Sequence, residues 1–224
     1  MSAISIKTYN SYHFGFLHDL TERHLKHLTK LFRTPAKTAD SVLGGRNSVL
    51  IDEINGLGPV VVKYYRRGGL VRYIVKQRYL KCGKTRGQKE YELLQKVRNL
   101  GINAPEPIVF AYRGRLFYQA WLVTREIKQH QTLAQISLSN ENRARILMKE
   151  VVKQVSILIK YSILHVDLHP GNIIVDKQDQ IYLLDFDKGR IFSGNKIKLE
   201  SRYISRWSRA ISKHNLPKIL TELM

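Results

Sequence analysis

HVDLHPGNIIVDKQDQIYLLDFDKGR, residues 165–190, is the stretch that decides the fold. Two short apolar runs, IIV and IYLL, flank the polar turn KQDQ, a pattern that predicts a β-hairpin. Asn172 precedes the first run and Asp185 follows the second, so the hairpin would return Asp185 close to Asn172. Amide and carboxylate oxygens are the hard ligands that Mg²⁺ prefers. The stretch therefore predicts a metal site held by Asn172 and Asp185, with two ordinary strands with polar ends as the simpler alternative.

The residue types in this stretch fit phosphoryl transfer from ATP. That chemistry needs a carboxylate to orient or deprotonate an acceptor hydroxyl, oxygen ligands for Mg²⁺ and a cation on the phosphates. Asp167 begins the loop that follows the longest predicted helix and shares that loop with Asn172. We therefore assign Asp167 as the catalytic carboxylate, and we expect ATP and Mg²⁺ as cofactors.

Length and composition limit the possible classes of protein. The chain has 224 residues, enough for one compact domain or two small lobes, and its 43% hydrophobic and 25% charged residues are typical of a globular protein. A single cysteine, Cys82, excludes an internal disulfide framework and fits a reducing compartment. The sequence has no apolar run of the roughly 18 residues that a membrane span needs, and its N-terminus does not resemble a signal peptide. We expect a cytosolic protein, or one that lies against a membrane from that side.

The net charge of +20 favours an anionic partner. Residues 60–90 contain ten Lys or Arg against one acid, and residues 188–218 contain nine against one. Nucleic acid, acidic lipid head groups and a phosphorylated substrate would all satisfy this charge. A generally solvated basic surface is the alternative that needs no partner.

A second hairpin is predicted upstream of the opening stretch. Two segments rich in β-branched and aromatic residues, 48–52 and 59–65, flank a Gly-bearing turn at 55–58. The preceding loop carries Gly44, Gly45 and Ser48. Paired glycines let backbone amides approach a phosphate closely, although most such pairs are plain turns. A helical pattern begins near Thr85, and Gly101 predicts its end.

Three further segments have helical spacing: residues 17–32, 140–164 and 199–213. The second is the longest, and Ser139 or Asn140 is its predicted N-terminal cap. The sequence of residues 116–127 predicts one long strand or a pair of strands. The sequence is thus β-rich in its first half and mostly helical in its second, which predicts an α+β fold of two unequal lobes. We place an N-terminal extension at 1–41, an N-lobe at 42–126 and a C-lobe at 127–224.

The motifs in this order resemble those of protein kinases. HVDLHPGN is similar to the catalytic loop H-R-D-L-x-x-x-N, and LLDFD is similar to the D-F-G strand end. VVVK resembles the V-A-I-K strand, which implies that Lys63 contacts the ATP phosphates. Its partner would be Glu90, or failing that Glu92, and GGRNSV would stand in place of the glycine-rich loop. The resemblance implies a protein-kinase-like fold with a small β-rich N-lobe and a compact, mostly helical C-lobe.

A narrower resemblance rests on KYYRRGGL, TRGQKEYELL, NAPEPI, DLHPGNI and LLDFDKGR. These segments are similar to bacterial 3-deoxy-D-manno-octulosonic acid (Kdo) kinases of the lipopolysaccharide kinase family. The resemblance implies a phosphotransferase with an alcohol group as acceptor, which phosphorylates a Kdo hydroxyl of Kdo-lipid A. It also implies a peripheral position on the cytoplasmic side of the bacterial inner membrane, without an obligatory nucleic acid.

Four residues are candidates for contact with this acceptor. The lipid is a dense polyanion on an anionic surface, so Arg66, Arg67 and Arg72 are expected to attract it. Asp187 is expected to assist the metal or the acceptor, with a salt bridge to a neighbouring cation as the alternative.

Other functions also fit the sequence. A heptose kinase of the same family and a small basic RNA-associated kinase-like ATPase would use the same catalytic residues. A non-catalytic nucleic-acid-binding protein would use only the basic surface. The sequence does not predict an oligomeric state.

Overall fold

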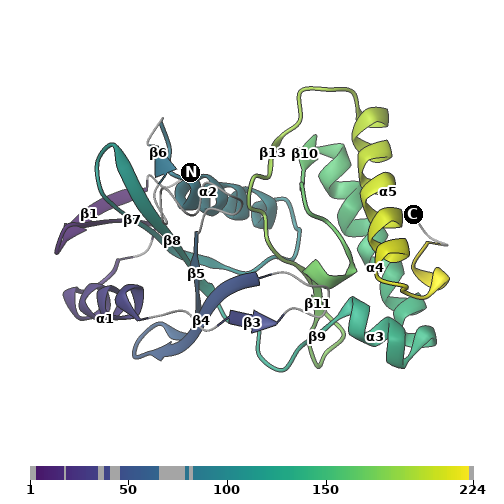
Figure 1. Cartoon of the computed structure of the whole chain (residues 1–224), viewed down its shortest axis with the longest axis horizontal. Helices are drawn as coiled ribbons and strands as arrows, with labels where there is room; N and C mark the ends of the chain where they lie inside the picture. The colour runs from purple at the N-terminus through teal and green to yellow at the C-terminus, as the bar shows by residue number, and fades with distance from the viewer. Residues whose placement is uncertain are drawn as a thin grey trace. The chain divides into compact units, whose positions relative to one another are not determined.

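The computed structural model describes residues 4–17, 19–34, 38–40, 46–65, 79–80 and 83–221. The chain divides into two compact units (Figure 1). Unit 1 comprises Met1–Asp40, Arg46–Glu92 and Glu106–Glu126, and unit 2 comprises Ser41–Gly45, Leu93–Pro105 and Ile127–Met224. One boundary between the units lies between Glu126 and Ile127. The segment Leu93–Pro105, which we assigned to the first lobe, belongs to unit 2.

Unit 1 is built on an antiparallel sheet, which has eight strands among the described residues. Its strands are β1 (Ser5–Tyr9), β2 (Tyr12–Phe16), β3 (Thr38–Asp40), β4 (Arg46–Ile54), β5 (Gly58–Tyr64), β6 (Tyr79–Leu80), β7 (Pro107–Arg113) and β8 (Phe117–Arg125). The order across the sheet is β1-β2-β7-β8-β5-β4-β3, and β6 pairs with β8. This arrangement places β5, which carries Lys63, in the interior of the sheet.

The β4–β5 hairpin confirms the one predicted from residues 48–65. Val49 pairs with Lys63, and the turn contains Gly56 and Gly58 at φ +84° and +75°. Only glycine adopts such angles without a steric penalty, so the turn residues fix the register. Val60 and Val62 point into the core and alternate with the half-buried Lys63. β5 ends at Tyr64, so the described strand does not extend to Arg67.

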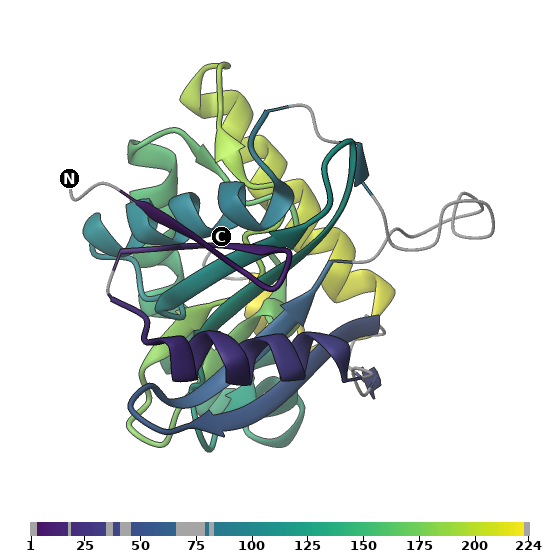
Figure 2. The same ribbon diagram turned by 90° about the vertical axis from the view of Figure 1, so that its left-hand side faces the viewer.

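The helix predicted within residues 17–32 is α1 (Glu22–Arg33). Thr21 caps it, because its hydroxyl accepts a hydrogen bond from the His24 amide at 3.3 Å. Its apolar stripe packs on aromatic residues of the sheet, and this core contains Tyr12, Phe14, Phe16, Leu25, Leu28, Phe32, Val60, Val62 and Trp121. Figure 2 shows α1 running along the β4–β5 hairpin. β1, β2 and α1, which fall in the segment 1–41 that we expected to form an extension, are therefore part of unit 1.

Helix α2 (Arg86–Asn99) begins in unit 1 and ends in unit 2. It ends where predicted, because Gly101 adopts φ +84° and the Ile102 amide donates to the Val97 carbonyl at 3.0 Å. These contacts satisfy carbonyls that the helix end would otherwise leave unpaired.

Unit 2 holds the remaining elements. They are β9 (Gln131–Thr132), α3 (Leu133–Ser139), α4 (Glu141–Lys160), β10 (Ile163–Leu164), β11 (Ile173–Val175), β12 (Ile181–Leu183), β13 (Arg190–Ile191), α5 (Lys196–Lys213) and the 3₁₀ turns η2 (Pro170–Asn172) and η3 (Lys218–Thr221). Asn140, one of the two predicted candidates, caps α4 by accepting from the Arg143 amide at 2.9 Å. Helix α4 has a buried apolar stripe and contacts α3 and α5, and α5 lies beside it in Figure 1. Among the described residues, no helix is long and apolar enough to cross a membrane.

The sequence reading missed several elements, of which β1, β2, β7 and α3 are the longest. β7 reads PIVFAYR, and five of its seven residues are buried. A strand buried on both faces lacks the alternation that predicts strands, and its apolar run cannot be told from a buried helix by periodicity.

Candidate functional site

The cation predicted for the phosphates is held by a carboxylate within unit 1. Lys63 Nζ lies 2.9 Å from both Oε1 and Oε2 of Glu90. The Tyr65 hydroxyl donates a further hydrogen bond to Glu90 Oε2 at 2.5 Å. The Glu90 side chain is 3% exposed and the Lys63 side chain 21%. A buried ion pair needs several hydrogen-bond partners to offset the free-energy cost of desolvation. Glu90 has two such partners, Lys63 and Tyr65.

The local sequence explains why Glu90 reaches β5. Gly87 lies one helical turn earlier on α2, and a Cβ there would meet the Trp121 carbonyl oxygen of β8 at 2.8 Å. Only a glycine permits this close approach of the helix to the sheet. Glu92, the alternative partner, instead pairs with Lys84 at 2.6 Å. The predicted choice of Glu90 over Glu92 thus agrees with the geometry.

In unit 2, the predicted hairpin brings the ends of its strands together. Ile173 pairs with Leu183, and the Leu184 amide donates to the Asn172 carbonyl at 2.8 Å. Because Leu184 precedes Asp185, this hydrogen bond holds the backbone before Asp185 against that of Asn172. Asp185 has φ +61°, a left-handed conformation that is uncommon outside glycine and costs backbone strain.

Asn172 is oriented by its own loop. Its Nδ2 donates to the Asp167 carbonyl at 2.8 Å. Because the amide nitrogen is engaged there, Oδ1 is the atom left to coordinate a cation. The backbone around it forms the 3₁₀ turn η2, which the His169 ring caps by accepting from the Gly171 amide at 3.1 Å. Burial, followed by the neighbouring His214, lowers the pKa of His169, which favours the neutral ring that can accept this hydrogen bond.

His165 makes contacts that suit a structural role. Its side chain is buried, and Nε2 lies 2.8 Å from the Leu184 carbonyl, so Nε2 carries the proton in this contact. The ring also packs edge-on against Phe186 at a centroid distance of 4.6 Å. The His165 amide donates to the Tyr203 hydroxyl at 2.8 Å. These contacts hold the strand end that carries Asp185.

Asp167 is half-exposed on the loop before η2. Nη2 of Arg206, on α5, donates to Asp167 Oδ1. His169 Nε2 lies 3.9 Å from the same oxygen. The carboxylate is therefore oriented by a cation that lies 39 residues later in the chain.

The donor atoms fit a magnesium ion bound through few protein ligands. Among the residues that the structure describes, no three His, Cys, Asp or Glu side chains gather as a metal cluster. Mg²⁺ does not need such a cluster, because it retains waters and phosphate oxygens and commonly uses one or two carboxylates. One amide oxygen and one carboxylate on Asn172 and Asp185 match that requirement.

Several predicted residues are not placed. Five of them lie outside the described residues: Gly44, Gly45, Arg66, Arg67 and Arg72. Ser48 lies on β4, but its side chain is also outside them. Asp187 is half-buried, two residues beyond Asp185. The roles of all seven residues stay predictions.

Sequence reasoning missed Tyr65, Arg206 and Tyr203. Tyr65 follows Lys63 by two residues and so shares its face of the chain, a signal that was available. Tyr203 and Arg206 lie three apart on α5, but nothing local indicates that they contact the loop near Asp167.

The two units are those of an α+β, protein-kinase-like fold, with an ion-paired lysine in the β-rich unit and, in the mostly helical one, the hairpin that carries Asn172 and Asp185. Within that class, the model of the lipopolysaccharide kinase (Kdo/WaaP) family matches residues 33–215. The chain belongs to this family.

Curated relatives agree with the family assignment. A protein of Vibrio vulnificus strain CMCP6 is 32% identical over 160 residues, which cover 70% of this chain and 66% of the relative. A protein of Xylella fastidiosa strain M23 is 27% identical over 184 residues, covering 81% and 68%. Both are named 3-deoxy-D-manno-octulosonic acid kinase. The aligned part of this chain thus spans about two thirds of the length of these relatives.

Proposed function

We propose that this protein transfers a phosphoryl group from ATP to a Kdo hydroxyl of a lipopolysaccharide inner-core precursor, Kdo-lipid A. The observation that carries the proposal is the 2.8 Å hydrogen bond from the Leu184 amide to the Asn172 carbonyl. It sets Asp185 beside Asn172 on the hairpin that the kinase-like motif predicts. The names of the curated relatives support the choice of Kdo as acceptor.

Each residue has a role that its contacts suit. Lys63 binds the α- and β-phosphates, and Glu90 holds its ammonium group in position. Asn172 and Asp185 would hold Mg²⁺. Asp167 orients the acceptor hydroxyl and accepts its proton, while Arg206 fixes the direction of the carboxylate. When bound, Mg²⁺-ATP supplies the phosphoryl group and neutralises its developing charge.

The acceptor and the charge of the protein suit each other. Kdo carries a carboxylate and lipid A carries phosphates, so the substrate is polyanionic, whereas this chain has a net charge of +20. Charge attraction of this kind also supports a peripheral position on the cytoplasmic side of the inner membrane. Arg66, Arg67 and Arg72 stay candidates for contact with the acceptor.

The test is to incubate the purified protein with ATP, Mg²⁺ and Kdo-lipid A and to measure the lipid by mass spectrometry. We expect the mass of one added phosphate, on the Kdo residue, and none when Asp167→Ala replaces the wild type. A heptose-containing acceptor without Kdo forms the parallel arm. If that acceptor alone gains phosphate, the substrate is heptose. If neither gains phosphate, the proposed activity is wrong.

A further inference from the structure

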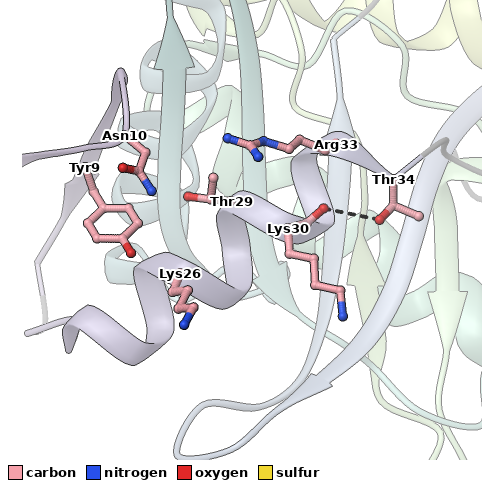
Figure 3. A pocket seen from close by; sticks show the side chains of 7 residues that line it. All are labelled: Tyr9, Asn10, Lys26, Thr29, Lys30, Arg33 and Thr34. Atoms are coloured by element: carbon pink, nitrogen blue, oxygen red, sulfur yellow. Dashed lines mark hydrogen bonds between the residues drawn. The ribbon is translucent and has the colours of Figure 1, made fainter.

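A second group of polar side chains lines a surface pocket of about 440 Å³ on unit 1. Helix α1 contributes three cations, Lys26, Lys30 and Arg33. Hydrogen-bonding groups from α1 and from the β1–β2 turn complete the lining: Tyr9, Asn10, Thr29 and Thr34. Figure 3 shows the Arg33 side chain extending over Thr29 toward that turn. Nothing in the proposed phosphoryl transfer uses these residues.

The three cations are exposed and uncompensated. Within the part of the chain that the structure describes, none of them forms an ion pair. The first turn of α1 contains one acid, Glu22. It lies eleven positions before Arg33, about 16 Å along the helix axis at 1.5 Å per residue. The pocket therefore carries three positive charges that no described acid pairs with.

Helix stabilisation accounts for only part of this cluster. Cations in the last turn of a helix interact favourably with its dipole, and Lys30 and Arg33 are in that turn. Lys26, in the middle of α1, gains little from the dipole. The terminal carbonyls already have other donors, since Thr34 Oγ1 donates to Lys30 O at 3.2 Å and the Tyr64 hydroxyl donates to Leu31 O at 2.5 Å. The cations are thus available for an external anion.

The elements that line the pocket are held in place by the core of unit 1 and by a tight turn. The opposite side of α1 is anchored in the core by Leu25, Leu28 and Phe32. The β1–β2 turn is tight, with Asn10 and Ser11 at φ +45° and +64°. Lys7 lies on the same face of β1 as Tyr9 and adds a further cation to this side of the sheet. A site with fixed walls binds an anion at a lower entropic cost than mobile surface lysines do.

We propose that this pocket binds the phosphate monoester group of an anionic membrane lipid. Ammonium and guanidinium groups, with the Tyr9 hydroxyl and the Asn10 amide as further donors in the lining, match the several acceptor oxygens of a phosphate. The choice of a lipid over a soluble phosphate rests on the proposed function, which places the acceptor on a membrane. The pocket would hold unit 1 at the surface where that acceptor lies.

Vesicle sedimentation of the full chain, without ATP or Kdo, tests this site separately from catalysis. The vesicles are phosphatidylcholine alone, or phosphatidylcholine with phosphatidic acid, which carries a phosphate monoester. We expect binding only to the second kind, with a loss of roughly tenfold or more on Lys30→Glu or Arg33→Glu. The matched control is Arg23→Glu, which reverses an exposed cation of α1 outside the pocket and should change binding less than twofold. Thermal unfolding should give the same Tm for all variants.

Three results would overturn the proposal. Equal losses in Arg23→Glu and Arg33→Glu would mean that general charge attraction, and not the pocket, drives binding. Unchanged binding in both pocket variants would exclude the site. NMR shifts at the pocket caused by inorganic phosphate, without any vesicle binding, would show a soluble ligand in place of a lipid. Loss of Kdo phosphorylation with normal vesicle binding would instead count against the proposed function alone.

Discussion

Lys63 Nζ is equidistant, at 2.9 Å, from the two carboxylate oxygens of Glu90, and Tyr65 donates to one of them. The lysine is on a strand and the glutamate on a helix 27 residues later. The contact thus ties α2 to β5 and fixes the direction of the one cation that we assign to the ATP phosphates.

Glu90→Gln should weaken catalysis through Lys63. The amide keeps the shape of the side chain but loses the charge that holds the ammonium group, so we expect the KM for ATP to rise and kcat to fall by roughly tenfold. Lys63→Met should cost more, on the order of 10²-fold in kcat, because a direct phosphate contact is lost. Steady-state kinetics on both variants checks this order. Glu92→Gln is the matched control, since Glu92 pairs with Lys84. A larger effect at Glu92 than at Glu90 would contradict the assignment.

Gly87→Ala should disturb the same pair from a distance. The added Cβ would lie 2.8 Å from the Trp121 carbonyl, so α2 has to move away from the sheet. A displacement of the order of 1 Å at a catalytic group is enough to lower kcat by about tenfold or more. Lys89→Ala, on the exposed side of the same helix turn, is the control and should be neutral. Normal ATP kinetics in Gly87→Ala would show that the close approach does not position Glu90.

Arg206→Leu should lower kcat with little change in the KM for ATP. The guanidinium orients the Asp167 carboxylate but is not assigned to the nucleotide. Proton transfer by a positioned side chain contributes roughly 10²–10⁴-fold, so a misdirected carboxylate should lose part of that factor. Arg206→Lys should restore some activity, and Arg209→Leu, an exposed cation of the same helix, should have no effect. The positioning role is wrong if Arg206→Lys and Arg206→Leu have identical kinetics.

Tyr203→Phe should destabilise the fold at neutral pH by about 1–3 kcal/mol, since the His165 amide loses its acceptor. The hydroxyl also donates to the Ile163 carbonyl at 2.7 Å. Urea unfolding of both proteins at pH 7 measures the difference.

The same substitution should change the pH dependence of stability. Burial raises the pKa of Tyr203 above its ordinary value, although the hydrogen bond from His165 opposes this. The unfolded chain therefore ionises above about pH 10 while the folded protein does not. The stability that Tyr203 contributes is complete below pH 10 and is lost as the pH rises toward the folded-state pKa. We expect the gap between wild type and Tyr203→Phe to narrow above pH 10, and a constant gap would contradict the buried neutral hydroxyl.

The sequence predicts best those features that depend on neighbouring residues. The β11–β12 hairpin follows from two apolar runs and a polar turn, and the caps Asn140 and Gly101 follow from the preferences of helix ends. The pairing of Lys63 with Glu90, and not with Glu92, came from the family resemblance and agrees with the geometry.

Features that depend on distant contacts were missed. The contact of Arg206 with Asp167 spans 39 residues and requires the packing of α5, which no local pattern describes. β1 and β2 join the sheet through β7, whose apolar sequence has no strand alternation. The left-handed backbone of Asp185 is imposed by the fold around it and is not encoded by the aspartate itself.

The central claim is that Asn172 and Asp185 hold one divalent ion together with the nucleotide. Mn²⁺ can replace Mg²⁺ and is visible by electron paramagnetic resonance, so its binding can be titrated with a non-hydrolysable ATP analogue present. The account predicts a bound ion in the wild type, and roughly tenfold or greater weakening in Asn172→Ala and in Asp185→Ala. Asp179→Ala, at an exposed carboxylate of the same hairpin, should leave the affinity unchanged. Equal Mn²⁺ affinity in the wild type and in both site variants would contradict the account.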